Sequence, residues 1–112
     1  MEFREQHIGQ ATVISIVGSI DALTAGEVTG FLSAQVQDGK RHLVADLSQV
    51  DFMSSAGLRT ILATLKESRQ GGGDLYIAAA QPGIEKILKM SGFTSILKSY
   101  PSVAEAVAGL GD

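Results

Sequence analysis

The sequence predicts an α/β fold in which a mixed sheet carries helices packed against it. Short runs rich in β-branched residues alternate with segments whose apolar residues recur at helical spacing. Apolar residues make up 45% of the 112 residues and charged residues 19%, which is typical of a globular chain. The predicted order is β-β-α-β-α-β-α, followed by an optional short strand and a last helix. Such alternation builds a sheet covered by helices, and the length fits one domain.

The first two predicted strands pair as a hairpin. Residues 3–8 can pair through a tight turn with the β-branched run at residues 12–17. The helix that follows has apolar residues at i, i+3, i+4 and i+8. We expect Thr24 to cap its first turn, with Glu27 three residues later completing a capping box. Residues 38–39, an Asp-Gly pair, are expected to end it.

The third strand and the second helix are predicted on either side of a polar turn. Residues 42–47 are apolar without alternation, as in a strand that is buried on both faces. Ser54 or Ser55 then caps a helix whose apolar residues recur at i, i+3, i+4 and i+7 from Leu58. This helix is expected to end at residues 69–70, which places an arginine near the negative end of the helix dipole.

The last third of the chain predicts one more buried strand and two helices. Residues 75–80 form the strand. Pro82 opens a short helix that stops at residues 91–92, a Ser-Gly pair. Residues 96–98 predict a brief edge strand, and Pro101 starts the final helix.

Composition excludes several classes of function. The net charge of -3 argues against a nucleic-acid partner, which requires a concentrated basic face. The absence of cysteine excludes disulfides, a thiolate nucleophile and a Cys-based zinc site. His7 and His42 stand apart from any acidic pattern, so we expect no metal, no cofactor and no catalytic site. No stretch approaches the ~20 apolar residues of a membrane helix, and the first residues lack the apolar core of a secretory signal. We therefore expect a cytoplasmic protein without membrane insertion that is not an enzyme.

The run at residues 51–59 places two serines at the start of a helix. The first backbone N–H groups of a helix lack intrahelical partners, and that end carries partial positive charge, which favours an anion. A phosphate on Ser55 would add roughly -1.5 to -2 charge without unfolding the helix. A partner touching this turn would be repelled, which would make a switch. Arg59, one turn later, can pair with a phosphate or with an acidic group of a partner.

A simpler interpretation of the same residues stays open. Serine at a helix N-cap is ordinary and stabilises by about 1 kcal/mol with no further role. Gly57 lacks a side chain, which allows either close helix–strand packing or the approach of another backbone or a nucleotide phosphate. Weak nucleotide binding at this glycine is therefore one hypothesis. Asp21 has a comparable alternative, since it can simply end a turn before Thr24.

Three motifs resemble one known family. Residues 52–58, Phe-Met-Ser-Ser-Ala-Gly-Leu, are similar to the signature of STAS domains, the family named for sulfate transporters and anti-sigma factor antagonists. Residues 46–50 resemble its lead-in strand and loop, and residues 18–21 followed by Ala25 resemble its Gly-x-x-Asp segment. The resemblance implies a single STAS domain over residues 1–112. It also implies a mixed sheet of four to five strands, with about four helices packed mainly on one face.

The resemblance also implies a mechanism. In the bacterial anti-sigma factor antagonists of this family, a serine after the lead-in loop is phosphorylated by the anti-sigma factor, which is a serine kinase. The unphosphorylated antagonist binds that kinase and releases the sigma factor, phosphorylation breaks the complex, and a PP2C-type phosphatase resets it. By position Ser55 matches the phosphorylated serine. Ser54, where the best-known members have Asp, is the second candidate. The predicted partner-binding residues around the site are Asp21, Ser54, Ala56, Gly57 and Arg59.

Two other functions compete with the phosphorylation switch. STAS proteins that are not phosphorylated can serve as accessory subunits of a membrane transport ATPase complex. The intact Ser55 and the presence of Arg59 favour the switch over this alternative. A small enzyme or nucleotide hydrolase would need a nucleophile–base pair or a metal site, and the sequence shows neither.

Several further residues carry structural expectations. Asp46, within a buried strand, needs a hydrogen-bond partner and is expected to brace the loop at Ser48. Asp51 is expected to be a solvated loop acid. Met90 and Phe93 are expected in the core. The lysines expected on a solvated basic rim are Lys86, Lys89 and Lys98.

Overall fold

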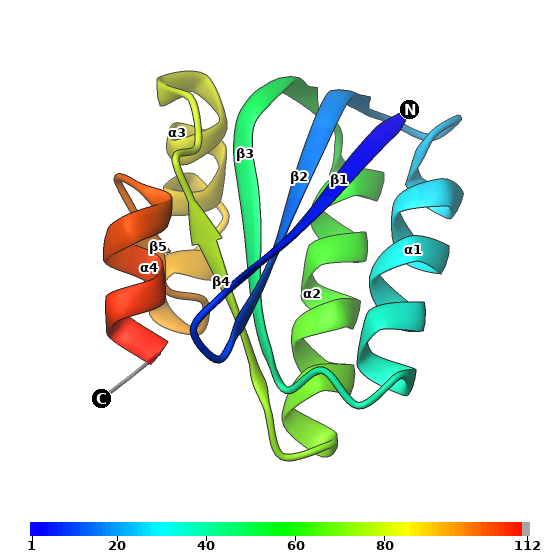
Figure 1. Ribbon diagram of the computed structural model, residues 1–112. Coiled ribbons are helices and arrows are strands. Elements are labelled where there is room, and N and C mark those ends of the chain that lie inside the picture. The colour runs from blue at the N-terminus through cyan, green and yellow to red at the C-terminus, as the bar shows by residue number, and fades with distance from the viewer. Residues whose placement is uncertain (111–112) are drawn as a thin grey trace.

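The sheet of the computed structural model, which describes residues 1–110, has five strands in the order β1-β2-β3-β4-β5 (Figure 1). The first pair of neighbours is antiparallel and the other three pairs are parallel, which confirms the predicted mixed sheet. Residues 111–112 of the predicted domain lie outside the described part. The strands are β1 (Glu2–Ile8), β2 (Ala11–Ile20), β3 (His42–Met53), β4 (Asp74–Ala78) and β5 (Ser99–Tyr100).

Three helices pack on one face of the sheet and one on the other. Side chains alternate along a strand, so neighbouring residues belong to different faces. Ile14 and Ala45 pack with α1 (Ala25–Gln37), α2 (Ser55–Gln70) and α3 (Pro82–Met90) in the larger apolar cluster. Their neighbours Val13 and Val44 pack with α4 (Val103–Leu110) in the smaller cluster. The short 3₁₀ turn η1 (Phe93–Ser95) follows α3.

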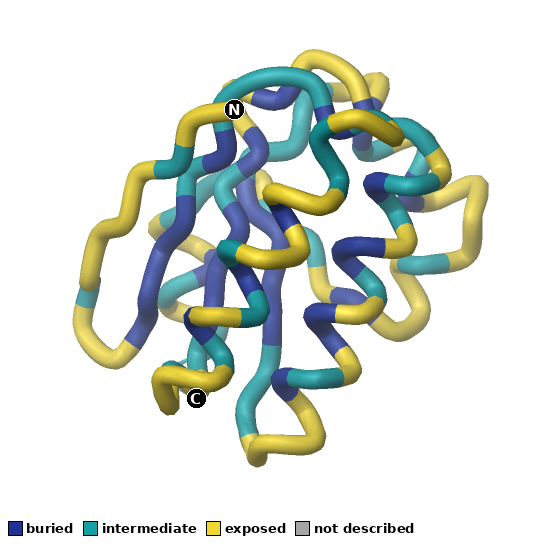
Figure 2. The backbone as a smooth tube through the Cα atoms, turned by 90° about the vertical axis from the view of Figure 1, so that its right-hand side faces the viewer, coloured by how far each residue is buried: buried dark blue, intermediate teal, exposed yellow. Residues whose placement is uncertain are grey.

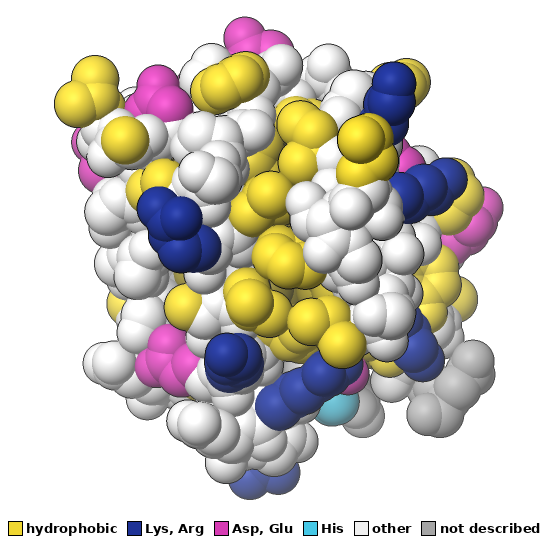
Figure 3. Space-filling view, turned by 180° about the vertical axis from the view of Figure 1, so that it is seen from behind, with side chains coloured by type: hydrophobic (Ala, Val, Ile, Leu, Met, Phe, Trp, Pro, Cys, Tyr) yellow, Lys and Arg dark blue, Asp and Glu magenta, His cyan; other side chains and the backbone are white. Residues whose placement is uncertain are grey.

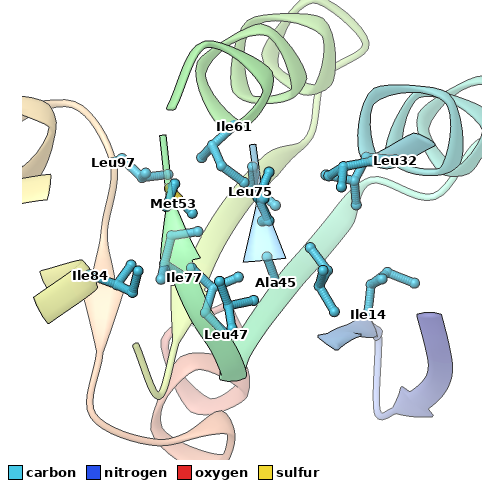
Figure 4. Packing of buried hydrophobic residues seen from close by; sticks show 14 of the residues in the cluster. Ile14, Leu32, Ala45, Leu47, Met53, Ile61, Leu75, Ile77, Ile84 and Leu97 are labelled. Atoms are coloured by element: carbon cyan, nitrogen blue, oxygen red, sulfur yellow. The ribbon is translucent and has the colours of Figure 1, made fainter. Parts of the chain in front are cut away.

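The larger cluster fills the space between the sheet and the three helices (Figure 4). Burial runs along the inner strands β2, β3 and β4, whereas β1, the outer sides of the helices and the turns are largely exposed (Figure 2). The cluster is aliphatic, because aromatic residues are few in this chain. No helix in residues 1–110 is long and apolar enough to cross a membrane. The cluster residues labelled in Figure 4 are Ile14, Leu32, Ala45, Leu47, Met53, Ile61, Leu75, Ile77, Ile84 and Leu97.

All five predicted strands exist, but their ends shift: β2 spans 11–20 and not 12–17, β4 spans 74–78 and not 75–80, and β3 and β5 differ further. The third strand continues to Met53 instead of ending at residue 47, because its second half pairs with β2 as far as the register pair Ile20–Met53. Two register shifts interrupt this pairing. Polar residues in the second half of β3 break the apolar pattern by which a strand is predicted from sequence. The edge strand lies at residues 99–100 and not at 96–98, since only the later residues pair with β4.

Helix starts also depart from local signals. The predicted capping box is wrong: the Thr24 side chain makes no cap bond, because its hydroxyl donates to the carbonyl of Ser19 at 2.7 Å. The last helix starts at Val103, where the Ser102 hydroxyl accepts from the Glu105 N–H at 3.1 Å. Met90 is 78% exposed, so its expected core position is wrong.

Other local expectations are confirmed. The predicted end of the second helix at residues 69–70 is correct, and Gly71 caps it. Phe93 is partly buried against the core, as expected. Asp51 is exposed but lies in β3 and not in a loop.

Candidate functional site

The turn from β3 into α2 is fastened to the end of β2. The Ser54 N–H donates to the Ile20 carbonyl at 2.9 Å. Ser54 has extended backbone angles, φ -87° and ψ 176°, and its hydroxyl oxygen accepts from the Gly57 N–H at 3.3 Å. Extended backbone and a side-chain acceptor define an N-cap, so Ser54 and not Ser55 caps the helix.

Ser55 is the first residue of α2 and is exposed. Within residues 1–110 its hydroxyl forms no hydrogen bond, so it is available to solvent or to a partner. Its backbone N–H belongs to the first turn, where donors lack intrahelical acceptors and the helix dipole is positive. The sequence left open which of the two adjacent serines caps the helix, and the structure gives them different environments.

Asp21 lies in the turn that directly follows β2, beside the Ser54 junction. Its carboxylate accepts the N–H groups of Leu23 at 2.9 Å and of Thr24 at 3.1 Å. The Asp21 N–H in turn donates to the Thr24 hydroxyl at 2.9 Å. These bonds form an Asx-type turn, which is the turn-ending role that the residues alone allowed. This turn leaves Leu23 91% exposed next to the site.

Gly57 faces inward. A Cβ at this position would lie 2.8 Å from Met53 Cγ and 2.9 Å from Ile20 Cγ2, so the glycine lets α2 approach the strands closely. Gly57 is buried and Ala56 is half-buried, whereas Arg59 is exposed and forms no ion pair within the described chain. The structure therefore gives Gly57 a packing role, and its burial offers no support for a nucleotide phosphate approaching it from solvent.

Asp46 braces the polar part of β3, as expected. Its Oδ1 accepts the Ser48 N–H at 3.0 Å, and its Oδ2 accepts the Ser15 hydroxyl at 2.9 Å. Nearby, the Ser19 hydroxyl donates to Asp51 at 2.8 Å. These bonds tie the second half of β3 to β2 and so position the turn that carries the serines.

A cavity of about 220 Å³ adjoins the end of β3 and was not anticipated from the sequence. Phe52 is 52% exposed beside it, although its aromatic side chain is costly to leave in water. The pair Phe52-Met53, which stands between Asp51 and the two serines, was the one signal available in the sequence. In the described part of the chain, no three His, Asp or Glu side chains gather as metal ligands. The cavity is lined by Asp51, Phe52, Met53, Gln81, Gly83, Ile84 and Ile87.

The chain is similar to known proteins over nearly its whole length. The family model described as STAS domain matches residues 2–106. An antagonist of anti-sigma factors from Bordetella bronchiseptica, named BtrV, is 33% identical over 108 residues, which cover 96% of this chain and 93% of BtrV. The crystal structure of an anti-sigma factor antagonist from Mycobacterium paratuberculosis matches with a TM-score of 0.91 and 27% identity. That match covers 99% of this chain and 94% of the other.

A second solved structure shows the shared fold alone. The Bacillus cell fate determinant SpoIIAA, solved in its phosphorylated form, matches with a TM-score of 0.72 and 18% identity. The match covers 96% of this chain and 97% of SpoIIAA.

Proposed function

The chain belongs to the STAS domain family, among its anti-sigma factor antagonists, and on that premise we propose that Ser55 is the phosphorylated residue of a partner switch. Proteins of this group are regulators and not enzymes. The unphosphorylated protein binds its anti-sigma factor, a serine kinase, and so releases the sigma factor. Phosphorylation of Ser55 turns this binding off, and a PP2C-type phosphatase restores it. The protein acts in the cytoplasm, where sigma factors work.

The difference between the two adjacent serines carries the proposal. The Ser54 hydroxyl already accepts from the Gly57 N–H, and the Ser54 backbone is held by Ile20. Ser55 is exposed, so a kinase can reach its hydroxyl without opening the helix. Modification of Ser54 would remove a cap, whereas modification of Ser55 would leave the cap in place.

The start of α2 is suited to a phosphate on Ser55. The positive end of the helix dipole and the free N–H groups of the first turn favour an added anion. Arg59 stands four residues later on the same side of the helix, which is the spacing at which side chains meet. The phosphorylated protein therefore keeps its fold while the surface at the turn changes charge. SpoIIAA, solved in a phosphorylated form, is one protein of this fold that accepts a phosphate.

A phosphorylation assay tests the assignment. The protein is incubated with its cognate anti-sigma factor and ATP, and the modified residue is mapped by mass spectrometry. We expect a single phosphate on Ser55, no incorporation in Ser55→Ala, and normal incorporation in the matched control Ser54→Ala. No phosphate in the presence of an active kinase, or phosphate on Ser54, would refute the assignment.

A binding assay tests the direction of the switch. Calorimetry with the anti-sigma factor should show wild-type affinity for Ser55→Ala. Affinity should fall by a factor of about 10 or more for Ser55→Asp, because like charges placed at an interface cost several kcal/mol. Equal binding by both variants would contradict the proposal that charge at this position controls the complex.

A further inference from the structure

The cavity beside the end of β3 has no part in the proposed switch. It measures about 220 Å³ and lies between the last residues of β3 and the first turns of α3. A protein cavity of about 150 Å³ that is lined by apolar side chains is large enough to bind benzene. The cavity beside β3 can therefore hold one ring-sized molecule.

Most of the residues that line this cavity are apolar. Met53 and Ile84 are buried, Ile87 is half-buried, and Phe52 is exposed. A phenyl ring that borders a cavity offers a stacking surface to a second ring, because aromatic pairs attract beyond the area that they bury. Seen from behind, hydrophobic side chains form a band down the middle of the molecule, with Lys and Arg side chains on both sides of it (Figure 3). This molecule thus leaves apolar surface open to solvent, and the cavity favours an apolar ring.

Gly83 leaves part of the cavity wall open. It is the second residue of α3 and lines the cavity. A Cβ at Gly83 would meet nothing within 4 Å apart from the backbone of its own helix. A larger side chain at this position would therefore extend into open space beside the cavity and fill part of it.

The two polar residues that line the cavity are Asp51 and Gln81. Asp51 is the one charged residue among those that line it, and it forms no ion pair within residues 1–110. The Gln81 side chain donates from Nε2 to the Ser48 carbonyl at 3.0 Å, which leaves its Oε1 as an acceptor. An unpaired carboxylate disfavours an anionic ligand, whereas acceptor oxygens suit a ligand that carries an O–H or N–H donor.

The position of the cavity in the sheet is typical of a ligand site. β3 and β4 are parallel neighbours, and the cavity is lined by the end of β3 and by Gln81 in the loop after β4. β3 ends and α3 begins at the same end of the sheet (Figure 1). In open α/β sheets, ligands bind in the crevice outside the carboxyl ends of the parallel strands.

The loop between β4 and α3 contains a strained residue. Ala79 has a φ of 57°, in the left-handed region that residues other than glycine seldom adopt. Its N–H donates to the Tyr100 carbonyl at 2.9 Å, and two residues later the Gln81 side chain is bonded to Ser48. Strain of this kind persists only where the surrounding structure fixes the backbone, and it is concentrated at functional sites. The polar side of the cavity is therefore preformed.

We propose that this cavity binds a small aromatic compound that carries an O–H or N–H donor and no negative charge. The ring would contact Phe52 and Ile87, and its donor would face the acceptor oxygens of Asp51 or Gln81. A nucleotide, the ligand considered above at Gly57, does not fit this chemistry because its phosphates would meet an unpaired carboxylate. The proposed site follows from the lining of the cavity alone and is independent of the proposed function.

Three probes with the same ring test the chemistry of the ligand. Benzyl alcohol, benzylamine and benzoate are each titrated into the isotope-labelled full chain and followed by amide NMR spectra. Benzyl alcohol should cause saturable shifts with a Kd on the order of 1 mM, and benzylamine should bind at least as tightly because its cation would face Asp51. Benzoate should bind at least about 10-fold more weakly than benzyl alcohol. The shifts are expected at the amides of the lining residues Phe52, Gln81, Gly83 and Ile87.

Variants place the probe in the cavity. Gly83→Leu should weaken the binding of benzyl alcohol at least about 10-fold, because the leucine takes the space of the ring. Gly26→Leu is the matched control: it changes the second residue of α1, where a Cβ would also meet nothing within 4 Å apart from its own helix backbone, and it should bind as wild type does. Asp51→Asn removes the carboxylate charge and should bring benzoate to within about 3-fold of benzyl alcohol.

Four results would overturn the proposal. The first is the absence of a saturable shift with benzyl alcohol or benzylamine in the wild-type protein. The second is equal binding of benzoate and benzyl alcohol, which would mean that the N-terminus of α3 and not Asp51 selects the ligand. The third is unchanged binding of benzyl alcohol by Gly83→Leu, and the fourth is an equal loss of binding in Gly83→Leu and Gly26→Leu. Amide spectra recorded before the probe is added show that each variant is folded.

Discussion

The N-terminal end of α2, which we call its first end, presents an exposed serine. Its C-terminal end, the last end, is held against the strands. Ser55 is exposed and its hydroxyl is free within residues 1–110. After the last turn, the Gly73 N–H donates to the Ser68 carbonyl at 2.9 Å, and the Asp74 N–H donates to the Arg41 carbonyl at 2.8 Å. One helix thus combines a fixed end, which maintains its packing, with an accessible end, whose charge can change without loss of the fold.

Replacing Gly73 by alanine should have the largest effect on stability. A Cβ at Gly73 would overlap the backbone carbonyl of Arg41, and backbone cannot rotate away as a side chain can. We expect the free energy of unfolding to fall by roughly 3 kcal/mol, measured by urea denaturation. Gly30→Ala in α1 is the control, because a Cβ there would meet nothing within 4 Å apart from the backbone of its own helix, and it should stabilise by up to ~1 kcal/mol. A Gly73→Ala protein as stable as wild type would show that the last end is not fixed.

Gly57→Ala applies the same change to the accessible end. The new Cβ would meet Met53 Cγ at 2.8 Å, Ile20 Cγ2 at 2.9 Å and the Ile20 carbonyl oxygen at 3.0 Å, whereas at Gly73 all three nearest atoms belong to the Arg41 backbone and the overlap is deeper. We expect a loss of roughly 2 kcal/mol in the free energy of unfolding, smaller than at Gly73. A loss greater than that at Gly73 would reverse the comparison of the two ends.

The two serines should separate stability from signalling. Ser54→Ala removes the N-cap acceptor of the Gly57 N–H and should cost about 1 kcal/mol in denaturant unfolding. Ser55→Ala removes no hydrogen bond and should change stability by less than ~0.5 kcal/mol. If both variants lost the same stability, Ser55 would share the capping role and its availability would be in question.

The smallest expected effect on stability is the pH dependence that comes from the ion pair of Lys40 and Glu5. A hydrogen bond from Lys40, with a further one to His7, holds the pKa of Glu5 below its ordinary value of 4.5. A lowered pKa in the folded state means that the pair stabilises above the unfolded pKa and that this contribution is lost as pH falls through the folded value. The urea midpoint of wild type should therefore fall more between pH 6 and pH 3 than that of Glu5→Gln. Lys40→Met should flatten the profile in the same way, and parallel profiles for all three proteins would rule out this contribution.

Much of the fold could be predicted because its signals are local. The β-branched run of β2 and the helical spacing in α2 depend on a few neighbouring residues, and both elements were found. The second half of β3 could not be found, because its polar residues form a strand only through pairing with β2. The prediction of a capping box at Thr24 was wrong for a similar reason. The Thr24 hydroxyl donates to the Ser19 carbonyl, and the Thr24 N–H donates to the Asp21 carboxylate.

In the candidate site, too, some features could be predicted from local sequence and others depend on residues that are distant in the chain. The signature around Ser55 and the acid at Asp21 are visible in the sequence, and the family that they indicate was correct. The cavity beside the end of β3 was not visible, because Phe52 and Ile87, which both line it, come from separate elements. Met90 was assigned to the core, since helical spacing shows which side of a helix is apolar but not what covers it.

The sequence by itself determined the order of the elements, the aliphatic core and the turn at which two serines begin a helix. Those features follow from composition and short-range periodicity, which need no knowledge of distant residues. Only the tertiary structure decided which serine is available. The hydrogen bond from the Ser54 N–H to Ile20, a residue more than thirty positions earlier, places Ser54 at the cap and leaves Ser55 exposed. Long-range pairing of strands therefore turns an ambiguous pair of serines into one structural residue and one candidate for phosphorylation.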